Sequence, residues 1–192
     1  MDFSFRATIH GPVDRVLVML RDRLTDLVPY LETVDHIEEV ERREEGSVVH
    51  ITNAWQGNSQ GVPAFARPFV TRAMTSWRDH AAWDTAARTV RWSFEPNRFG
   101  KLYTCGGLNH IRALDANTTE LELNGSLVIH PEHLPLPGPI ARRFAPKITT
   151  WIVGKIQPNL LLVPKAIEAF FQHEASEAGA ASPGDGEAPA PV

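Results

Sequence analysis

The chain has 192 residues, of which 43% are hydrophobic and 22% are charged, and this composition is typical of one globular domain with a sizeable core. Its formal net charge of −4 argues against nucleic acid, or an anionic membrane surface, as an electrostatic partner. The single cysteine, Cys105, excludes an internal disulfide, and no basic segment followed by an apolar run opens the chain, so we expect a cytoplasmic protein.

The N-terminal region predicts one strand followed by two helices. Residues 2–10 alternate between apolar and polar side chains, which is typical of a half-buried strand. Gly11 and Pro12 end it, and Pro12 suits the first position of a helix, where its missing N–H costs nothing. Residues 13–24 have helical spacing of apolar side chains, and residues 25–34 predict a second, shorter helix.

The middle of the chain predicts six strands joined mostly by short turns. They cover residues 34–46, 47–55, 73–84, 88–96, 100–116 and 119–130. Short connections between consecutive strands indicate an antiparallel meander.

The C-terminal stretch 148–171 is apolar for more than twenty residues, which raises the question of a membrane span. Lys155 and Lys165 interrupt it, and a central lysine costs about 3 kcal/mol on insertion scales. Its large apolar side chains recur every three or four residues, so we expect an amphipathic helix that packs on the sheet, with a bend or restart near Pro158 and another near Pro164. We expect no stable membrane insertion.

These elements predict an α+β fold: a curved antiparallel sheet of about seven strands, two short helices after the first strand, and a long C-terminal helix across the concave face. We expect one ligand-binding domain over residues 1–174. The remaining residues, 175–192, lack large apolar side chains except Val192 and predict a disordered tail.

Several segments carry a family resemblance: "IHGPVDRVLVMLRD", "VDHIEEVERREEG", "WRDHAAWD", "VRWSFEP" and "IQPNLLLVPKAIEAFF". In this order they resemble the START-like (SRPBCC) superfamily of helix-grip proteins, which includes polyketide cyclase/dehydrase and lipid-transport proteins, and the resemblance covers residues 2–173. It implies an apolar ligand held between the sheet and the last helix. The superfamily also contains cyclases, hydrolases and chaperone activators, so the resemblance implies a fold more than an activity.

Strand alternation predicts which side chains line such a cavity. Gly106, Gly107 and Gly125 inside strands favour a sharp bend of the sheet or room for a ligand. The candidate ligand-binding residues are Trp77, Trp92, Phe94, Tyr103, Asn109, Leu123, Ile152, Ile156, Val163 and Ile167.

The connection 57–72 is longer than a hairpin needs, and we expect it to be either a lid or a packed surface loop. Phe65 and Phe69 would be its apolar plugs.

Candidates for catalysis are few. Tyr103, His80 and His110 are weak acid–base candidates, and either histidine could instead face solvent. The "HPEH" segment at 130–133 offers two imidazoles and a carboxylate but no third ligand by spacing, so we expect a surface loop and no metal. We expect Cys105 to be a small core residue, and no motif indicates a cofactor.

The sequence therefore favours binding, and possibly transport, of a hydrophobic small molecule or lipid. Two alternatives remain open: a polyketide cyclase/dehydrase-like enzyme that uses the same cavity, and a chaperone-like protein-interaction module. The sequence leaves the oligomeric state open.

Overall fold

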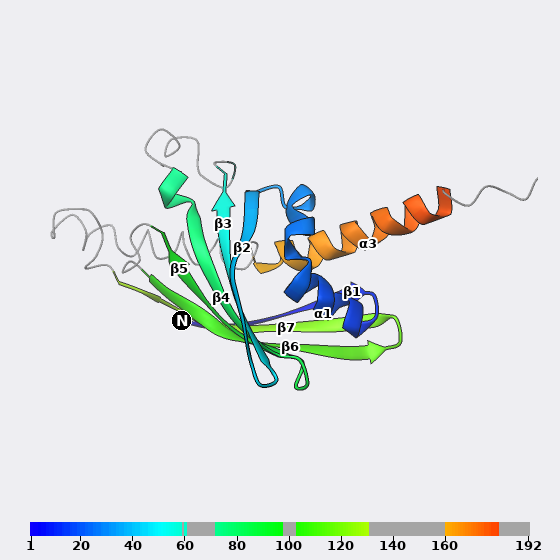
Figure 1. Ribbon diagram of the computed structural model, residues 1–192, viewed down its shortest axis with the longest axis horizontal. Helices are drawn as coiled ribbons and strands as arrows, with labels where there is room; N and C mark the ends of the chain where they lie inside the picture. The colour runs from blue at the N-terminus through cyan, green and yellow to red at the C-terminus, as the bar shows by residue number, and fades with distance from the viewer. Residues whose placement is uncertain (59, 61–71, 98–102, 131–159, 181–192) are drawn as a thin grey trace, which may run out of the picture.

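The computed structural model describes residues 1–58, 60, 72–97, 103–130 and 160–180 (Figure 1). In chain order its elements are β1 (Asp2–His10), α1 (Val13–Asp22), the 3-10 helix η1 (Leu24–Tyr30), β2 (Val34–Glu45), β3 (Val48–Gly57), the 3-10 turn η3 (Arg72–Met74), β4 (Ser76–Asp84), β5 (Thr89–Pro96), β6 (Tyr103–Asp115), β7 (Thr118–Ile129) and α3 (Leu162–Ala180).

The strands form one antiparallel sheet of seven, in the order β1-β7-β6-β5-β4-β3-β2. Strands β2 to β7 form an antiparallel meander. Strand β1 pairs antiparallel with β7, with Phe5 opposite Leu123. The predicted α+β fold with a curved antiparallel sheet is confirmed. Some boundaries were wrong. The predicted strand 73–84 begins only at Ser76, because the preceding residues form η3, and the predicted helix 25–34 is the 3-10 helix η1, which ends at Tyr30.

Two of the strand glycines let the sheet bend and let rings pack on it. A Cβ on Gly107 would lie 1.9 Å from the carbonyl oxygen of Asn124 on β7, so these two strands approach too closely for any side chain there. A Cβ on Gly125 would lie 2.6 Å from the Phe3 ring and 2.9 Å from the Trp92 ring. The space beside Gly125 is thus filled by the protein's own aromatic rings, and this glycine does not argue for a ligand.

One end of the concave face is closed by the helices. α1, η1 and α3 lie together over this end in Figure 1, and their buried side chains join those of the strands in one core. Val16, Leu27 and Ile167, one from each helix, are fully buried. The hydrophobic spacing of α1 explains its placement, because Val13, Val16 and Leu17 fall on one helical face.

Helix α3 packs against η1 and β1 through its first turns. The Phe170 ring meets Tyr30 edge-on at 5.8 Å, and the Arg15 guanidinium lies 4.0 Å from the centre of the Phe171 ring. Glu174 pairs with Arg15, which fastens the outer side of the helix to α1.

The ends of α3 bear on two predictions. Pro164 lies in the first turn, where its missing N–H costs no helical hydrogen bond, and this agrees with the restart predicted near it; Pro158 lies outside the described residues. The helix continues to Ala180, so residues 175–180 are helical and the predicted tail boundary at 174 was too early.

Candidate functional site

Four aromatic rings gather on the concave face at the end of the sheet away from α1. We call them the concave aromatic cluster: Trp55 on β3, Trp77 on β4, and Trp92 and Phe94 on β5. Trp55 and Trp77 are cross-strand partners whose rings stack at 5.4 Å. The Phe94 ring contacts rings on either side of it: its centre lies 6.5 Å from the centre of the Trp77 ring and 4.8 Å from that of Trp92. Strand alternation brings these rings together because each occupies an inward position of its strand.

Only half of the cluster is buried: Trp55 and Trp92 are 9% and 7% exposed. Trp77 and Phe94 are only half-buried, and so is Tyr103, which packs near Trp92 and Phe94. The Nε1 group of Trp92 donates a 2.8 Å hydrogen bond to Oδ1 of Asn109, so Asn109 holds the indole in place. These five predicted lining residues therefore lie on one face, and three of them keep aromatic surface that a ligand can contact.

The remaining predicted lining residues divide differently. Leu123 and Ile167 are 5% and 0% exposed, respectively, and belong to the main core. They are therefore packing residues and offer no surface to a ligand. Val163 is half-buried and packs against that core. The other predicted residues, Ile152, Ile156, Phe65 and Phe69, lie outside the described residues, as does most of the predicted lid.

Asp79 is the residue that sequence reasoning missed. It occupies an inward position of β4, with Asn53 opposite it on β3 and Phe94 opposite it on β5. Its Oδ1 atom is shielded from solvent and has no hydrogen-bond partner in the described part of the protein. Burial raises the pKa of this carboxyl from 3.8 to about 7. A carboxyl with this pKa among aromatic rings is a candidate for ligand contact or proton transfer.

A simple signal was available for Asp79. In "WRDHAAWD" it has the same parity as Trp77, Ala81 and Trp83, all assigned to the inward face of this strand. Its pairing with Asn53, which is 6% exposed, depends on the register of β3 and β4 and was not visible in the sequence.

The two histidine candidates lie away from this site. His80 lies on the outer face of the sheet, where Nε2 is 3.0 Å from Glu95 and Nδ1 is 3.2 Å from the Thr52 hydroxyl. His110 has the same outward parity on β6, between the inward Asn109 and Ile111. The pleat therefore separates both imidazoles from the concave cluster, so the structure agrees with the alternative in which the two histidines face away from the cavity.

The outer face carries a shallow hollow of about 530 Å³ beside His80, bordered by charged side chains that include Glu41, Arg43 and Arg91. The imidazole there is already engaged by Glu95 and Thr52. An apolar ligand would bury little of its surface in an exposed hollow bordered by charged side chains.

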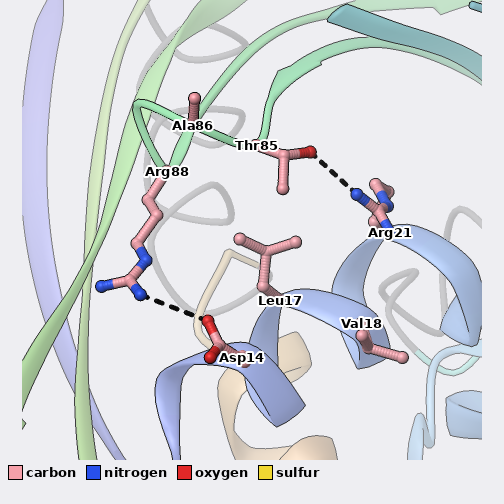
Figure 2. A pocket seen from close by; sticks show the side chains of 7 residues that line it. All are labelled: Asp14, Leu17, Val18, Arg21, Thr85, Ala86 and Arg88. Carbon is pink, nitrogen blue, oxygen red and sulfur yellow. Dashed lines mark hydrogen bonds and ion pairs between the residues drawn. The ribbon is translucent and has the colours of Figure 1, made fainter. Parts of the chain in front are cut away.

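A second hollow, of about 500 Å³, lies between α1 and the turn that joins β4 to β5 (Figure 2). Leu17 points into it, and its polar groups bond across it: Arg88 pairs with Asp14 at 3.3 Å, and Arg21 donates to the Thr85 hydroxyl at 2.8 Å. These contacts connect α1 to the turn. The polar groups that border the hollow therefore have partners within the protein and do not call for a ligand.

Cysteine and metal chemistry find no support in the described residues. Cys105 is 4% exposed in a small core with Phe3 and Trp92, and burial raises its pKa to about 11, so it is the core residue we expected. Within the described ranges no group of three or more His, Cys, Asp or Glu side chains is placed to hold a metal ion. Of the "HPEH" segment only His130 is described.

No family model and no curated protein matches this chain, but solved structures do. The Zhui aromatase/cyclase from a Streptomyces species superposes with a TM-score of 0.64 at 16% identity, over 93% of this chain and 98% of its own. A protein from Thermus thermophilus gives 0.57 at 18% identity, over 95% and 100% of the two chains. Norcoclaurine synthase from Thalictrum flavum gives 0.51 at 14% identity, over 90% and 86%.

Seven antiparallel strands curved around a concave face, with a C-terminal helix packed at one end, define a helix-grip protein. The structural matches agree: the chain has the START-like (SRPBCC) fold, as the sequence resemblance implied. No helix in the described part of the chain is long and apolar enough to cross a bilayer.

Proposed function

We propose that this protein binds an apolar small molecule or lipid on the concave face of its sheet, against the concave aromatic cluster. The observation that carries the proposal is the half-buried state of Trp77, Phe94 and Tyr103, which keep accessible aromatic surface on an inward face. A bound ring or chain would remove this surface from water at about 25 cal/mol per Å².

The structural neighbours are compatible with this proposal. One of them, norcoclaurine synthase, has been solved in complex with dopamine and hydroxybenzaldehyde, at a TM-score of 0.52 and 11% identity to this chain. That protein, of similar architecture and very different sequence, thus holds small molecules, which is the class of ligand proposed for this chain.

The first test is native mass spectrometry of the purified protein, followed by organic extraction of anything bound. A co-purifying lipid, sterol, quinone or polyketide would support the proposal and name the ligand class. A panel of fluorescent apolar probes, titrated against the intrinsic tryptophan signal, tests the same site when nothing co-purifies.

Trp77→Ala is the variant for this test, because Trp77 stacks on Trp55 and still presents accessible surface. We expect probe affinity to fall about five- to tenfold, since one aromatic contact is worth about 1 kcal/mol or slightly more. Tyr30→Ala is the matched control, because it removes a ring of η1 that packs on Phe170 at the far end of the fold. Equal affinity in wild type and Trp77→Ala, or no binding of any probe, would refute the proposal.

An enzymatic role is the second candidate, and Asp79 favours it. A carboxyl with a pKa of about 7 exchanges protons readily at neutral pH, and Tyr103 on the same face, whose pKa burial raises to about 12, stays protonated and able to donate. Conversion of an extracted ligand by wild type, with none by Asp79→Asn, would favour catalysis over carriage.

A chaperone-like role has weaker support. It requires a contiguous exposed apolar patch, whereas the large exposed apolar side chains of the described surface are scattered singly. They are Met1, Val18, Val40, Leu114 and Val128.

A further inference from the structure

Two buried polar atoms on the same part of the concave face have no hydrogen-bond partner among the described residues. One is Oδ1 of Asp79, and the other is Nε1 of Trp55. They belong to neighbouring strands: Trp55 lies opposite Trp77, two residues along β4 from Asp79. Leaving a buried polar atom unpaired costs about 1–3 kcal/mol, so two of them within one aromatic cluster indicate a place that a ligand's polar groups complete.

The residues that face Asp79 across the sheet carry no charge. Asn53 faces it from β3 and Phe94 from β5, and neither residue titrates. From β2, the Arg42 guanidinium is already bonded to Glu39 at 2.8 Å and to Asp22 at 3.1 Å.

The other titratable groups on this face do not supply a charge either. From β6, burial raises the pKa of Tyr103 to about 12 and that of Cys105 to about 11, so both stay neutral at physiological pH. His80, the neighbour of Asp79 in the chain, is on the outer face and bonded to Glu95; its charge lowers the pKa of Asp79, but by less than burial raises it. Among the described residues, Oδ1 of Asp79 therefore has no cation within hydrogen-bond reach.

We propose that Asp79 and the concave aromatic cluster select ligands that carry a protonated amine on an apolar body. This inference rests on the proposed function and names the chemical class that the site prefers. The ammonium group would donate to the Asp79 carboxylate, and the apolar body would lie on the rings of Trp77 and Phe94.

Charge and ring chemistry together favour an amine over a neutral hydroxyl. A hydroxyl can donate to the Asp79 carboxylate but leaves its charge uncompensated, whereas an ammonium group donates a hydrogen bond and also neutralises that charge. Aromatic faces attract cations within about 6 Å of the ring centre. Phe94 lies opposite Asp79 on β5, and Trp77, stacked on Trp55, lies two residues along β4. A neutral donor gains neither the charge neutralisation nor the attraction to the rings.

The test compares 2-(2-naphthyl)ethylamine with 2-(2-naphthyl)ethanol, which has the same body and a neutral donor. Affinities are measured by calorimetry between pH 5 and pH 9 on the full-length wild type, Asp79→Asn and Glu95→Gln. Glu95→Gln is the matched control, because it removes a carboxylate from the outer face of the adjacent strand.

We expect the amine to bind wild type and Glu95→Gln at least tenfold more tightly than the alcohol at pH 8, and the two probes to bind Asp79→Asn equally. The amine's affinity for wild type should fall by up to about tenfold per pH unit below pH 7, as Asp79 takes up a proton, while the alcohol's stays flat.

The outcomes separate the two proposals. Equal binding of both probes to wild type, or an amine preference that survives Asp79→Asn, overturns amine selection and leaves apolar binding standing. Failure of both probes to bind any variant, together with failure of the apolar probe panel, overturns the proposed function as well.

Discussion

Replacing Asp79 by Asn should stabilise the ligand-free protein at neutral and alkaline pH and change little in acid. The folded protein holds the proton of this carboxyl more tightly than the unfolded chain does, because burial raises its pKa from 3.8 to about 7. A group whose folded pKa is raised contributes its full stability below the unfolded pKa, near pH 4. That contribution is lost as pH rises towards 7, where the folded protein must ionise a carboxyl without a cation.

The size of the effect follows from the two pKa values. Each unit of difference corresponds to about 1.4 kcal/mol, so ionisation of Asp79 costs the folded state up to about 4 kcal/mol by pH 8. Asn keeps the shape of the side chain and never ionises. We therefore expect Asp79→Asn to match wild type within about 1 kcal/mol at pH 4 and to exceed it by as much as about 4 kcal/mol at pH 8.

Urea unfolding followed by tryptophan fluorescence, at one-unit steps from pH 4 to pH 9, measures this difference. Other ionising groups act on both proteins alike, so subtracting one curve from the other isolates Asp79. Asp2→Asn, at an exposed position of β1, controls for the loss of one negative charge. Parallel stability curves for wild type and Asp79→Asn would show that the carboxyl is solvated or paired, and would refute the reasoning.

Three further predictions concern packing and reactivity. Gly125→Ala should lower the free energy of unfolding by about 1–3 kcal/mol in urea titrations, because the new Cβ would lie 2.6 Å from Phe3 and 2.9 Å from Trp92; an unchanged midpoint would mean that these rings move freely. Ile167→Ala should cost about 2–5 kcal/mol by the same measurement, since its side chain is fully buried on the inner face of α3, and a loss below about 1 kcal/mol would contradict that placement. Cys105 should react with a thiol reagent at pH 8 far more slowly in the native protein than in urea, because burial raises its pKa to about 11; native reaction at the unfolded rate would refute its burial.

Much of the fold could be predicted from the sequence, because the local periodicity of apolar residues indicates which face of a helix or strand is buried. Alternation in residues 2–10 and helical spacing in 13–24 predicted β1 and α1, the helix two residues too long at its C-terminal end, and short turns predicted the meander. The aromatic positions Trp77, Trp92 and Phe94 followed from the same period of two. Where local preference was ambiguous, as at residues 73–75, the predicted strand was too long, since a 3-10 turn occupies that place.

The order and face of individual side chains thus came from the sequence alone, but their neighbours did not. Cross-strand register is set by hydrogen bonding between segments far apart in the chain, so only the tertiary structure placed Asn53 opposite Asp79 and Trp55 against Trp77. It also placed His80 beside Glu95 and Thr52, and it showed that the room beside Gly125 is filled by Phe3 and Trp92. Parity along the strand marks Asp79 as inward-facing, but an unpaired carboxyl is a property of everything around it, so its missing partner became visible only once the strands were assembled.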